Sequence, residues 1–262
     1  MLYLKRKREN IMRIITMRPI IVVLAVLLVN VSSYANASSS EKSKRIIAGF
    51  IKQQTKSNIS IGRSISTILT RYPEQVDTVL PIALELYPEK YKQIIIGAIS
   101  AESALACDVV AAAIESNIVD SDEIVRNAIE TDPAYANEII ETAATSDIAE
   151  IQNIVRVGIT TEGTDGNAVM KSALTLFPDH LVGILSGAIQ ALPGQINEFV
   201  QSAISLFPNK AEQVVTTAVS QNTNGDNRKI VNQAIANGVN ESAAIEAALA
   251  GGAGQQELVV KK

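Results

Sequence analysis

The sequence predicts an all-α fold: an α-solenoid-like array of short antiparallel helices with a 15-residue period and one helix per repeat. Three observations predict it. Prolines recur in one 15-residue register, adjacent aliphatic residues recur at positions 7 and 8 after each block opens, and alanine recurs at position 11. Apolar pairs at this spacing form the stripe of an amphipathic helix, whereas a half-buried strand would need strict alternation.

The register runs without a gap through ten blocks, from Pro73 to Asn222. Position 7 holds Val79, Ile94, Val109, Ile124, Ile139, Ile154, Val169, Ile184, Phe199 and Val214. Position 11 holds Ala83, Ala98, Ala113, Ala128, Ala143, Gly158, Ala173, Ala188, Ala203 and Ala218. A helix of about three turns is marginal alone in water, so each block must pack its stripe against its neighbours. Two blocks are expected to form one hairpin layer.

This architecture resembles that of helical-repeat solenoids such as the HEAT, armadillo and tetratricopeptide classes. The resemblance is confined to architecture, because the block is 15 residues long and carries none of the signature residues of those classes. It therefore implies no functional site.

Residues 1–37 have the three parts of a secretory signal peptide. The basic front consists of Lys5, Arg6, Lys7, Arg8, Arg13 and Arg18. An apolar run of twelve residues, Ile20 to Val31, follows, and Ala35 and Ala37 supply a cleavage site. Since a membrane-spanning helix needs roughly 20 apolar residues, we expect cleavage near Ala37 and export, either to the periplasm or out of the cell. The start codon stays open between Met1, Met12 and Met17.

Residues 38–72 are predicted to form two N-terminal capping helices. The first spans Glu41 to Lys56, with Ile46, Ile47, Phe50 and Ile51 directed inward. The second spans Ile61 to Arg71, with Ile65, Ile68 and Leu69 on its apolar side.

The ten repeats occupy residues 73–222. Proline at the first position suits the start of a helix, because the backbone N–H that proline lacks would have no hydrogen-bond partner there. Pro81 lies at position 9 of the first block, where it removes a hydrogen bond, so a kink or break is expected. Asn117, Asp132 and Asp147 at position 15 are candidate caps of the following helix.

After Asn222 the register slips by one residue. Residues 223–250 are predicted to form two C-terminal capping helices, Arg228 to Ala236 and Glu241 to Ala250, the second with Asn240 as its N-cap. Residues 251–262 are expected to be a flexible polar tail.

No catalytic, cofactor-binding or metal-ligating residue is predicted. Cys107 and His180 are the only cysteine and histidine, and five blocks of stacked helices would hold them roughly 20 Å or more apart. Zinc would need several such residues. The loops 164–167 and 222–227 are rich in oxygen donors, but they lack the alternating ligands and final Glu of a calcium loop, and turn formation explains their composition.

The charge is unevenly distributed along the chain. Without residues 1–37 the chain carries 17 basic and 26 acidic residues, so nucleic acid and anionic membrane surfaces are not expected partners. Residues 93–170 have a net charge of −12, whereas residues 38–92 have +4. Ten carboxylates of the middle segment are expected to face outward: Glu115, Asp120, Asp122, Glu123, Glu130, Asp132, Glu138, Glu141, Asp147 and Glu150.

Two explanations of this acidic band stay open. It is either a solvated face that keeps an apolar array soluble or a docking band for a basic protein partner. The leading functional hypothesis is therefore an exported, non-catalytic helical-repeat protein that serves as a protein-interaction scaffold. The alternatives are a self-assembling structural protein of the envelope or extracellular matrix and, third, a carboxylate-dependent enzyme.

Overall fold

The structure is a computed structural model that describes residues 41–161, 164–223 and 225–258. The predicted leader, residues 1–37, lies outside them. Every regular element of the described residues is a helix, which confirms the all-α prediction. The described residues fall into two units, with the division between Phe50 and Ile51.

The described part of the first unit is residues 41–50, the beginning of a helix that runs from 41 to 56. The prediction that its four apolar residues face inward is wrong for two of them. Ile51 is fully buried, but Ile46 is 63% and Phe50 40% exposed. Residues four apart share a helix face, so Ile46 and Phe50 lie together on a face rotated by about 100° from that of Ile47 and Ile51.

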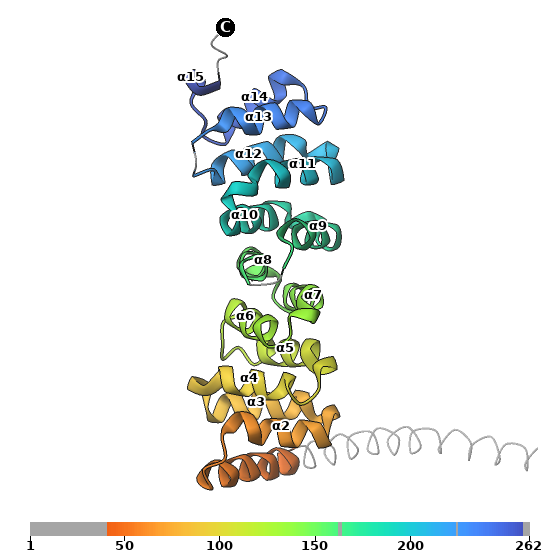
Figure 1. The fold of residues 1–262 in the computed structure, drawn as a ribbon, viewed down its shortest axis with the longest axis vertical. Coiled ribbons are helices and arrows are strands. Elements are labelled where there is room, and N and C mark those ends of the chain that lie inside the picture. Colours follow the sequence, from red (N-terminus) through yellow and green to blue (C-terminus); the bar gives the residue numbers. More distant parts are fainter. Residues whose placement is uncertain (1–40, 162–163, 224, 259–262) are drawn as a thin grey trace, which may run out of the picture. The chain divides into compact units, whose positions relative to one another are not determined.

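The second unit contains two alternating sets of helices (Figure 1). The even-numbered helices are α2 (Ile61–Arg71), α4 (Tyr91–Ile99), α6 (Ser121–Thr131), α8 (Ile151–Thr160), α10 (Leu181–Ala191), α12 (Ala211–Gln221) and α14 (Glu241–Ala250). The odd-numbered helices are α3 (Val76–Leu86), α5 (Ala106–Glu115), α7 (Ala136–Ser146), α9 (Gly166–Leu176), α11 (Ile196–Leu206), α13 (Asn227–Ala236) and α15 (Gln255–Leu258).

The helix starts follow the predicted period. From α2 to α12 each helix begins 15 residues after the one before it, which extends the frame one block upstream of Pro73. Helix α13 begins one residue late, as the register slip predicts, and α14 returns to the original frame with Asn240 as its N-cap. The described part of the chain thus keeps one helix per 15 residues.

Most turns consist of a single 3₁₀ turn before the α-helix. These turns are Pro73–Gln75, Pro88–Lys90, Ser103–Leu105, Pro133–Tyr135, Ile148–Glu150, Pro178–His180, Pro193–Gln195 and Pro208–Lys210. Proline therefore opens the 3₁₀ turn, and the α-helix begins three residues later. Of the predicted position-15 caps, Asp132 accepts a hydrogen bond from the backbone N–H of Ala134 at 3.2 Å, whereas Asn117 and Asp147 make no capping bond of this kind.

Each helix packs on the helices two places before and after it, so the even- and odd-numbered helices form two columns. Figure 1 shows α6, α8, α10 and α12 on one side and α5, α7, α9 and α11 on the other. One layer therefore comprises two consecutive helices, and residues about 30 apart meet between layers, as in the hydrogen bond between Gln190 and Gln221 (2.9 Å). Between α9 and α10 the chain bends by 118°, so this pair turns back at an oblique angle.

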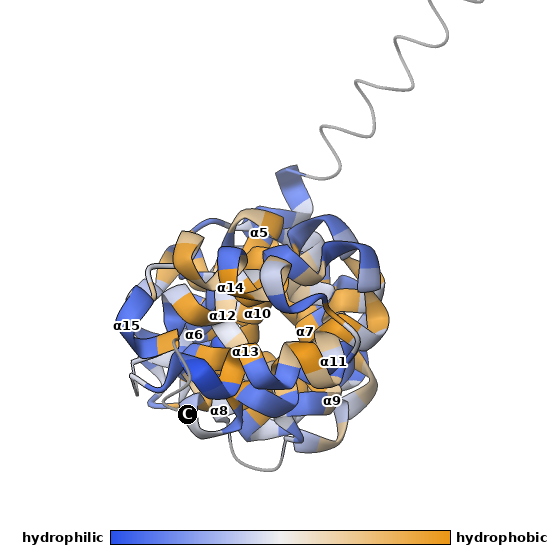
Figure 2. Ribbon diagram, turned by 90° about the horizontal axis from the view of Figure 1, so that it is seen from above, coloured by the Kyte–Doolittle hydropathy of each residue, from blue (hydrophilic) through white to orange (hydrophobic). Residues whose placement is uncertain are grey.

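The core lies between the two columns. All residues at positions 7, 8, 11 and 12 of the ten blocks are buried, which confirms the predicted stripe. Figure 2 shows the hydrophobic residues gathered on the inner sides of the helices and hydrophilic residues on the outer sides. Burial of this stripe in every block holds each short helix to its neighbours.

The predicted break at Pro81 is absent. Helix α3 continues through Pro81 to Leu86 and has the same 11-residue length as α2. The lost backbone hydrogen bond is outweighed by packing, because Val79 and Leu80 before the proline and Ala83 after it are fully buried.

Several contacts between layers bring backbone against backbone, and those at Gly97 and Gly187 involve glycines within α-helices. A Cβ atom added to Gly97 of α4 would overlap the backbone of Gly62 in α2, and one added to Gly187 of α10 would overlap the carbonyl of Gln152 in α8. Glycine at these positions is required by close approach of the helices.

Four residues of the segment predicted as a flexible tail form α15. Leu258 is buried, and Glu257 accepts hydrogen bonds from the backbone N–H of Asn227 (2.7 Å) and from its side chain (3.2 Å). Glu257 therefore caps the start of α13, and the prediction of a tail fails for residues 255–258.

Candidate functional site

The structure divides the predicted acidic band between the two ends of the helices. The odd-to-even turns, α5–α6 and α7–α8, carry Glu115, Asp120, Asp122, Glu123, Asp147 and Glu150. The α6–α7 turn and the start of α7 carry Glu130, Asp132 and Glu138, and Glu141 lies in the middle of α7. An 11-residue helix is roughly 16 Å long, so the ten carboxylates do not form one continuous surface.

Four of the carboxylates line one open cavity of about 490 Å³, which we call the acidic pocket. It lies between the α5–α6 turn and the α7–α8 turn of the next layer, and its carboxylates are those of Asp120, Asp122, Asp147 and Glu150. The remaining lining residues are Ile114, Asn117, Ile118, Val119, Ser121 and Asn153. The pocket therefore combines negative charge with an apolar rim.

An irregular turn creates this pocket. Where most odd-to-even turns have a 3₁₀ turn, Asn117 ends α5 with a φ of 52°, a left-handed conformation that asparagine tolerates better than most residues. Ile118 stands at the position that proline holds in other blocks, and it is 37% exposed. The backbone of Asp120 then starts α6, while its carboxylate makes no capping hydrogen bond.

Two of the four pocket carboxylates bond to side chains of the neighbouring layer. Asp147 accepts a hydrogen bond of 2.7 Å from the hydroxyl of Ser121, and Asp122 lies 3.5 Å from the guanidinium of Arg156. Both contacts connect α6 with the following layer. These two carboxylates therefore have a part in holding the layers together.

Asp120 and Glu150 are differently placed. Both are exposed, and among the described residues no cation lies within ion-pair distance of either. Glu150 accepts a hydrogen bond of 2.7 Å from the side-chain amide of Asn153, which leaves its charge uncompensated. The pocket thus keeps two exposed negative charges that a bound cation or basic side chain can neutralise, in addition to Asp147, whose bond to the neutral hydroxyl of Ser121 leaves its charge in place.

Glu123, in the same turn of α6, belongs to a neutralised cluster instead. It accepts a hydrogen bond of 2.9 Å from the Tyr91 hydroxyl and lies 3.9 Å from the ammonium of Lys92 and 3.8 Å from Arg126. Burial raises the pKa of Tyr91 above its ordinary value of 10.0, and the hydrogen bond to Glu123 raises it further. This cluster joins α4 to α6.

Cys107 and His180 lie in separate layers. Cys107 is a half-buried free thiol in α5, and His180 is exposed at the end of the turn Pro178–His180. Helices α7 and α9 lie between α5 and that turn in the array. In residues 41–161, 164–223 and 225–258, no group of three or more His, Cys, Asp or Glu side chains is arranged to hold a metal ion.

The two oxygen-rich loops use their side chains locally. Asp165 caps α9 by accepting hydrogen bonds from the backbone N–H groups of Asn167 (3.0 Å) and Ala168 (3.2 Å). The Asn222 amide donates to the side chain of Asn227 at 2.9 Å. A helix cap at Asp165 and a side-chain bond between Asn222 and Asn227 are the turn contacts that such residues commonly make.

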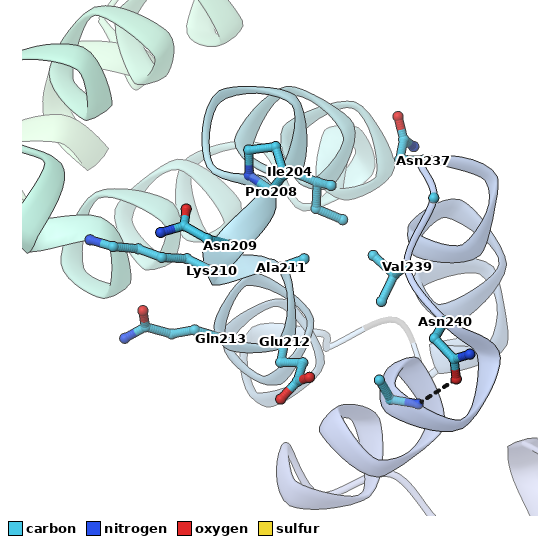
Figure 3. Close-up of a pocket in the computed structure, with 12 residues that line it drawn as sticks. Ile204, Pro208, Asn209, Lys210, Ala211, Glu212, Gln213, Asn237, Val239 and Asn240 are labelled. Atoms are coloured by element: carbon cyan, nitrogen blue, oxygen red, sulfur yellow. Dashed lines mark hydrogen bonds between the residues drawn. The ribbon is translucent and has the colours of Figure 1, made fainter.

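A second cavity, of about 540 Å³, lies between the start of α12 and the α13–α14 turn (Figure 3). Lys210 points away from Val239 and Asn240, toward the preceding layer, where it donates a 2.8 Å hydrogen bond to the carbonyl of Pro178. Asn240 caps α14. Lys210 and Asn240 are therefore engaged in contacts within the structure itself.

A shallow groove of about 780 Å³ runs between α2 and α4 over the contact of Gly62 with Gly97. Its lining is mostly hydroxyl and amide side chains, with the side chain of Ile96 45% exposed. No carboxylate lines it, in contrast to the acidic pocket.

Sequence reasoning missed the pocket itself, although it found the four carboxylates. The usable signal was the loss of the repeat pattern at one turn, where Asn117 and Ile118 replace the aromatic residue and proline of the regular turns, such as Phe177 and Pro178. The exposed pair of Ile46 and Phe50 was also missed.

No single helix of the described residues is long and apolar enough to cross a bilayer. The segments Gly166–Leu176 and Pro178–Ala191 meet the length and composition criteria only as a pair, bent by 118°.

Comparison of the chain with protein-family models, with curated proteins and with solved structures found no match.

Proposed function

We propose that the chain is an exported, non-catalytic scaffold that binds a basic protein partner at the acidic pocket. The observation that carries the proposal is the position of Asp120 and Glu150 beside one cavity, both exposed and with no cation of the described residues within ion-pair distance. Exposed carboxylates of this kind steer a basic partner and fix its register more than they add affinity.

The apolar rim supports a protein partner over a free cation. Ile118, at the edge of the pocket, is 37% exposed, and Ile148, one layer on at the same repeat position, is 36% exposed. A partner segment that alternates basic and apolar side chains can cover both features at once. Burial of the apolar part then supplies affinity, and the carboxylates supply specificity.

The test is chemical cross-linking in the compartment where the chain accumulates, followed by mass spectrometry of the captured proteins. The wild-type chain is expected to capture a partner through a basic segment, and the double variant Asp120→Lys, Glu150→Lys is expected to lose it. Glu246→Lys, an exposed reversal on α14, is the matched control. Equal capture by the wild type and the double variant would contradict the proposal.

Export is supported by residues 1–37 and has a separate test. The N-terminus of the accumulated protein, determined by mass spectrometry, is expected at Ser38. An intact Met1, Met12 or Met17 terminus on the accumulated protein would contradict export by cleavage.

A further inference from the structure

We propose that the basic partner of the acidic pocket is a second copy of this chain, which docks the outer face of its helix 41–56. This inference rests on the proposed function, since it names the occupant of the same pocket. Its starting point is a helix face that the described residues leave uncovered: Ile46 is 63% and Phe50 40% exposed. An exposed apolar pair on the first helix of a repeat array is unusual, because terminal repeats normally turn a polar face outward.

The C-terminal end of the array differs in this respect. There α15 lies against α13, with Glu257 bonded to the start of that helix and Leu258 buried. The end of the array that carries α15 is thus closed by part of the chain itself, whereas Ile46 and Phe50 stay exposed.

The charge of helix 41–56 is opposite to that of the pocket. The helix carries five basic residues and one acidic residue. The basic residues are Lys42, Lys44, Arg45, Lys52 and Lys56, all exposed. Glu41 is paired with Lys44 at 3.3 Å.

Four of the five basic side chains lie away from the buried side of the helix. With 100° per residue, Lys42, Ile46 and Phe50 form one line of i, i+4 neighbours, and Lys56 and Arg45 lie beside it on the side away from buried Ile51, with Lys52 next to Arg45. This part of the helix surface therefore carries both apolar and basic side chains, the two kinds that would match the acidic pocket. Its Ile46 and Phe50 correspond to the exposed Ile118 and Ile148, and its cations correspond to Asp120 and Glu150.

A second copy is the occupant that the sequence itself supplies. The net charge of +4 on residues 38–92 and of −12 on residues 93–170 gives two copies complementary surfaces, present at equal concentration in the same place. The contact joins different surfaces of the two copies, so it is heterologous and extends to larger assemblies unless its rotation closes.

The experiment is sedimentation analysis of the purified protein, expressed from its full sequence and isolated in the form that accumulates. The wild type is expected to associate with rising concentration, and more weakly at high salt, because exposed charges are screened. Two variants separate the partner surfaces: a helix variant with Arg45→Glu and Lys52→Glu, and a pocket variant with Asp120→Lys and Glu150→Lys. Each alone is expected to weaken association by about tenfold or more.

The decisive sample is an equimolar mixture of the two variants. The acidic helix of one then meets the basic pocket of the other, so the mixture is expected to associate more strongly than either variant does alone. Lys171→Glu and Glu246→Lys, both exposed and in other parts of the array, are matched controls that should associate as the wild type does. Far-ultraviolet circular dichroism checks that every variant stays helical.

A wild type that is monomeric at all concentrations and low salt, or a mixture that fails to associate when the wild type does, would overturn the inference. A monomeric chain that still captures a foreign basic protein through Asp120 and Glu150 overturns this inference alone. A chain that neither associates nor captures a partner overturns the proposed function as well.

Discussion

Two pairs of stacked turns in this array occupy equivalent places and differ in chemistry. In one pair, Pro178–His180 and Pro208–Lys210, the cation of Lys210 reaches back to the preceding layer, at 2.8 Å from the carbonyl of Pro178 and 3.9 Å from Asp179. In the other pair, the α5–α6 turn and Ile148–Glu150, carboxylates face a cavity, and no cation of the described residues lies within ion-pair distance of Asp120, Asp147 or Glu150. The helices that follow these turns still begin in one 15-residue frame.

The comparison indicates that the frame is set by the core and that the turns are free to vary. Positions 7, 8, 11 and 12 are buried in both regions alike. Layer spacing is therefore maintained by apolar contacts that do not depend on the turn sequence. A turn can then acquire charge, an αL residue or a cavity with little effect on the neighbouring layers.

The largest effect should come from the core. Ile139→Ala removes a fully buried side chain of α7 and is expected to lower the free energy of unfolding by about 2–5 kcal/mol, measured by urea denaturation. Ile148→Ala makes the same change nine residues later in an exposed turn, where the expected change is within about 0.5 kcal/mol. Equal losses of unfolding free energy for the two variants would contradict the inference that the core, and not the turns, maintains the layers.

A smaller loss is expected from the contact of α2 with α4. Gly97→Ala places a Cβ against the backbone of Gly62, which cannot rotate away, so the free energy of unfolding should fall by about 1–3 kcal/mol. Gly194→Ala is the control, because a Cβ there meets no atom within 4 Å and alanine restricts the unfolded chain. A Gly97→Ala variant as stable as this control would contradict the close approach of the two helices.

The charge reversal at the acidic pocket sharpens the comparison, since it should separate binding from stability. For Asp120→Lys with Glu150→Lys, the free energy of unfolding should change by no more than about 0.5 kcal/mol per site, because both side chains are exposed. The affinity for a Lys- and Arg-containing amphipathic peptide, measured by calorimetric titration, should fall about tenfold. A large loss of stability would mean that these carboxylates serve the fold.

The smallest effect concerns Tyr91 and alkaline pH. Because its pKa is raised in the folded chain, its contribution to stability is complete below pH 10.0 and is lost as the pH rises through the higher folded-state pKa. The free energy of unfolding of the wild type should therefore decline more steeply above that pH than that of Tyr91→Phe. Parallel declines in the two proteins would contradict a raised pKa of Tyr91 in the folded chain.

The sequence was sufficient for features that repeat and insufficient for features that occur once. Ten aligned blocks specify the helix period and the buried positions, since each block repeats the same apolar spacing. The break at Pro81 was wrongly expected because a local rule about one hydrogen bond ignored the buried neighbours Val79 and Ala83. Residues 255–258 were wrongly assigned to a flexible tail, because Glu257 acquires its partner only when α13 is folded beside it.

The candidate site was likewise predicted only in part: its carboxylates were found, but not which of them lie together. The sequence identified every carboxylate of the pocket, but it also grouped them with Glu130 and Glu138, which lie at the other end of the helices. Only the pairing of layers, with residues about 30 apart in contact, decides which carboxylates meet.

That pairing is also the central claim, and dipolar distance measurement between two spin labels tests it directly. With Cys107 replaced by alanine, one sample carries labelled cysteines at Ile118 and Ile148, and the other at Ile118 and Ala134, all exposed positions of the described chain. Layers about 8–10 Å apart and helices roughly 16 Å long predict the shorter distance for the pair 30 residues apart. A shorter distance for Ile118 and Ala134 would contradict the two-column array and, with it, the acidic pocket.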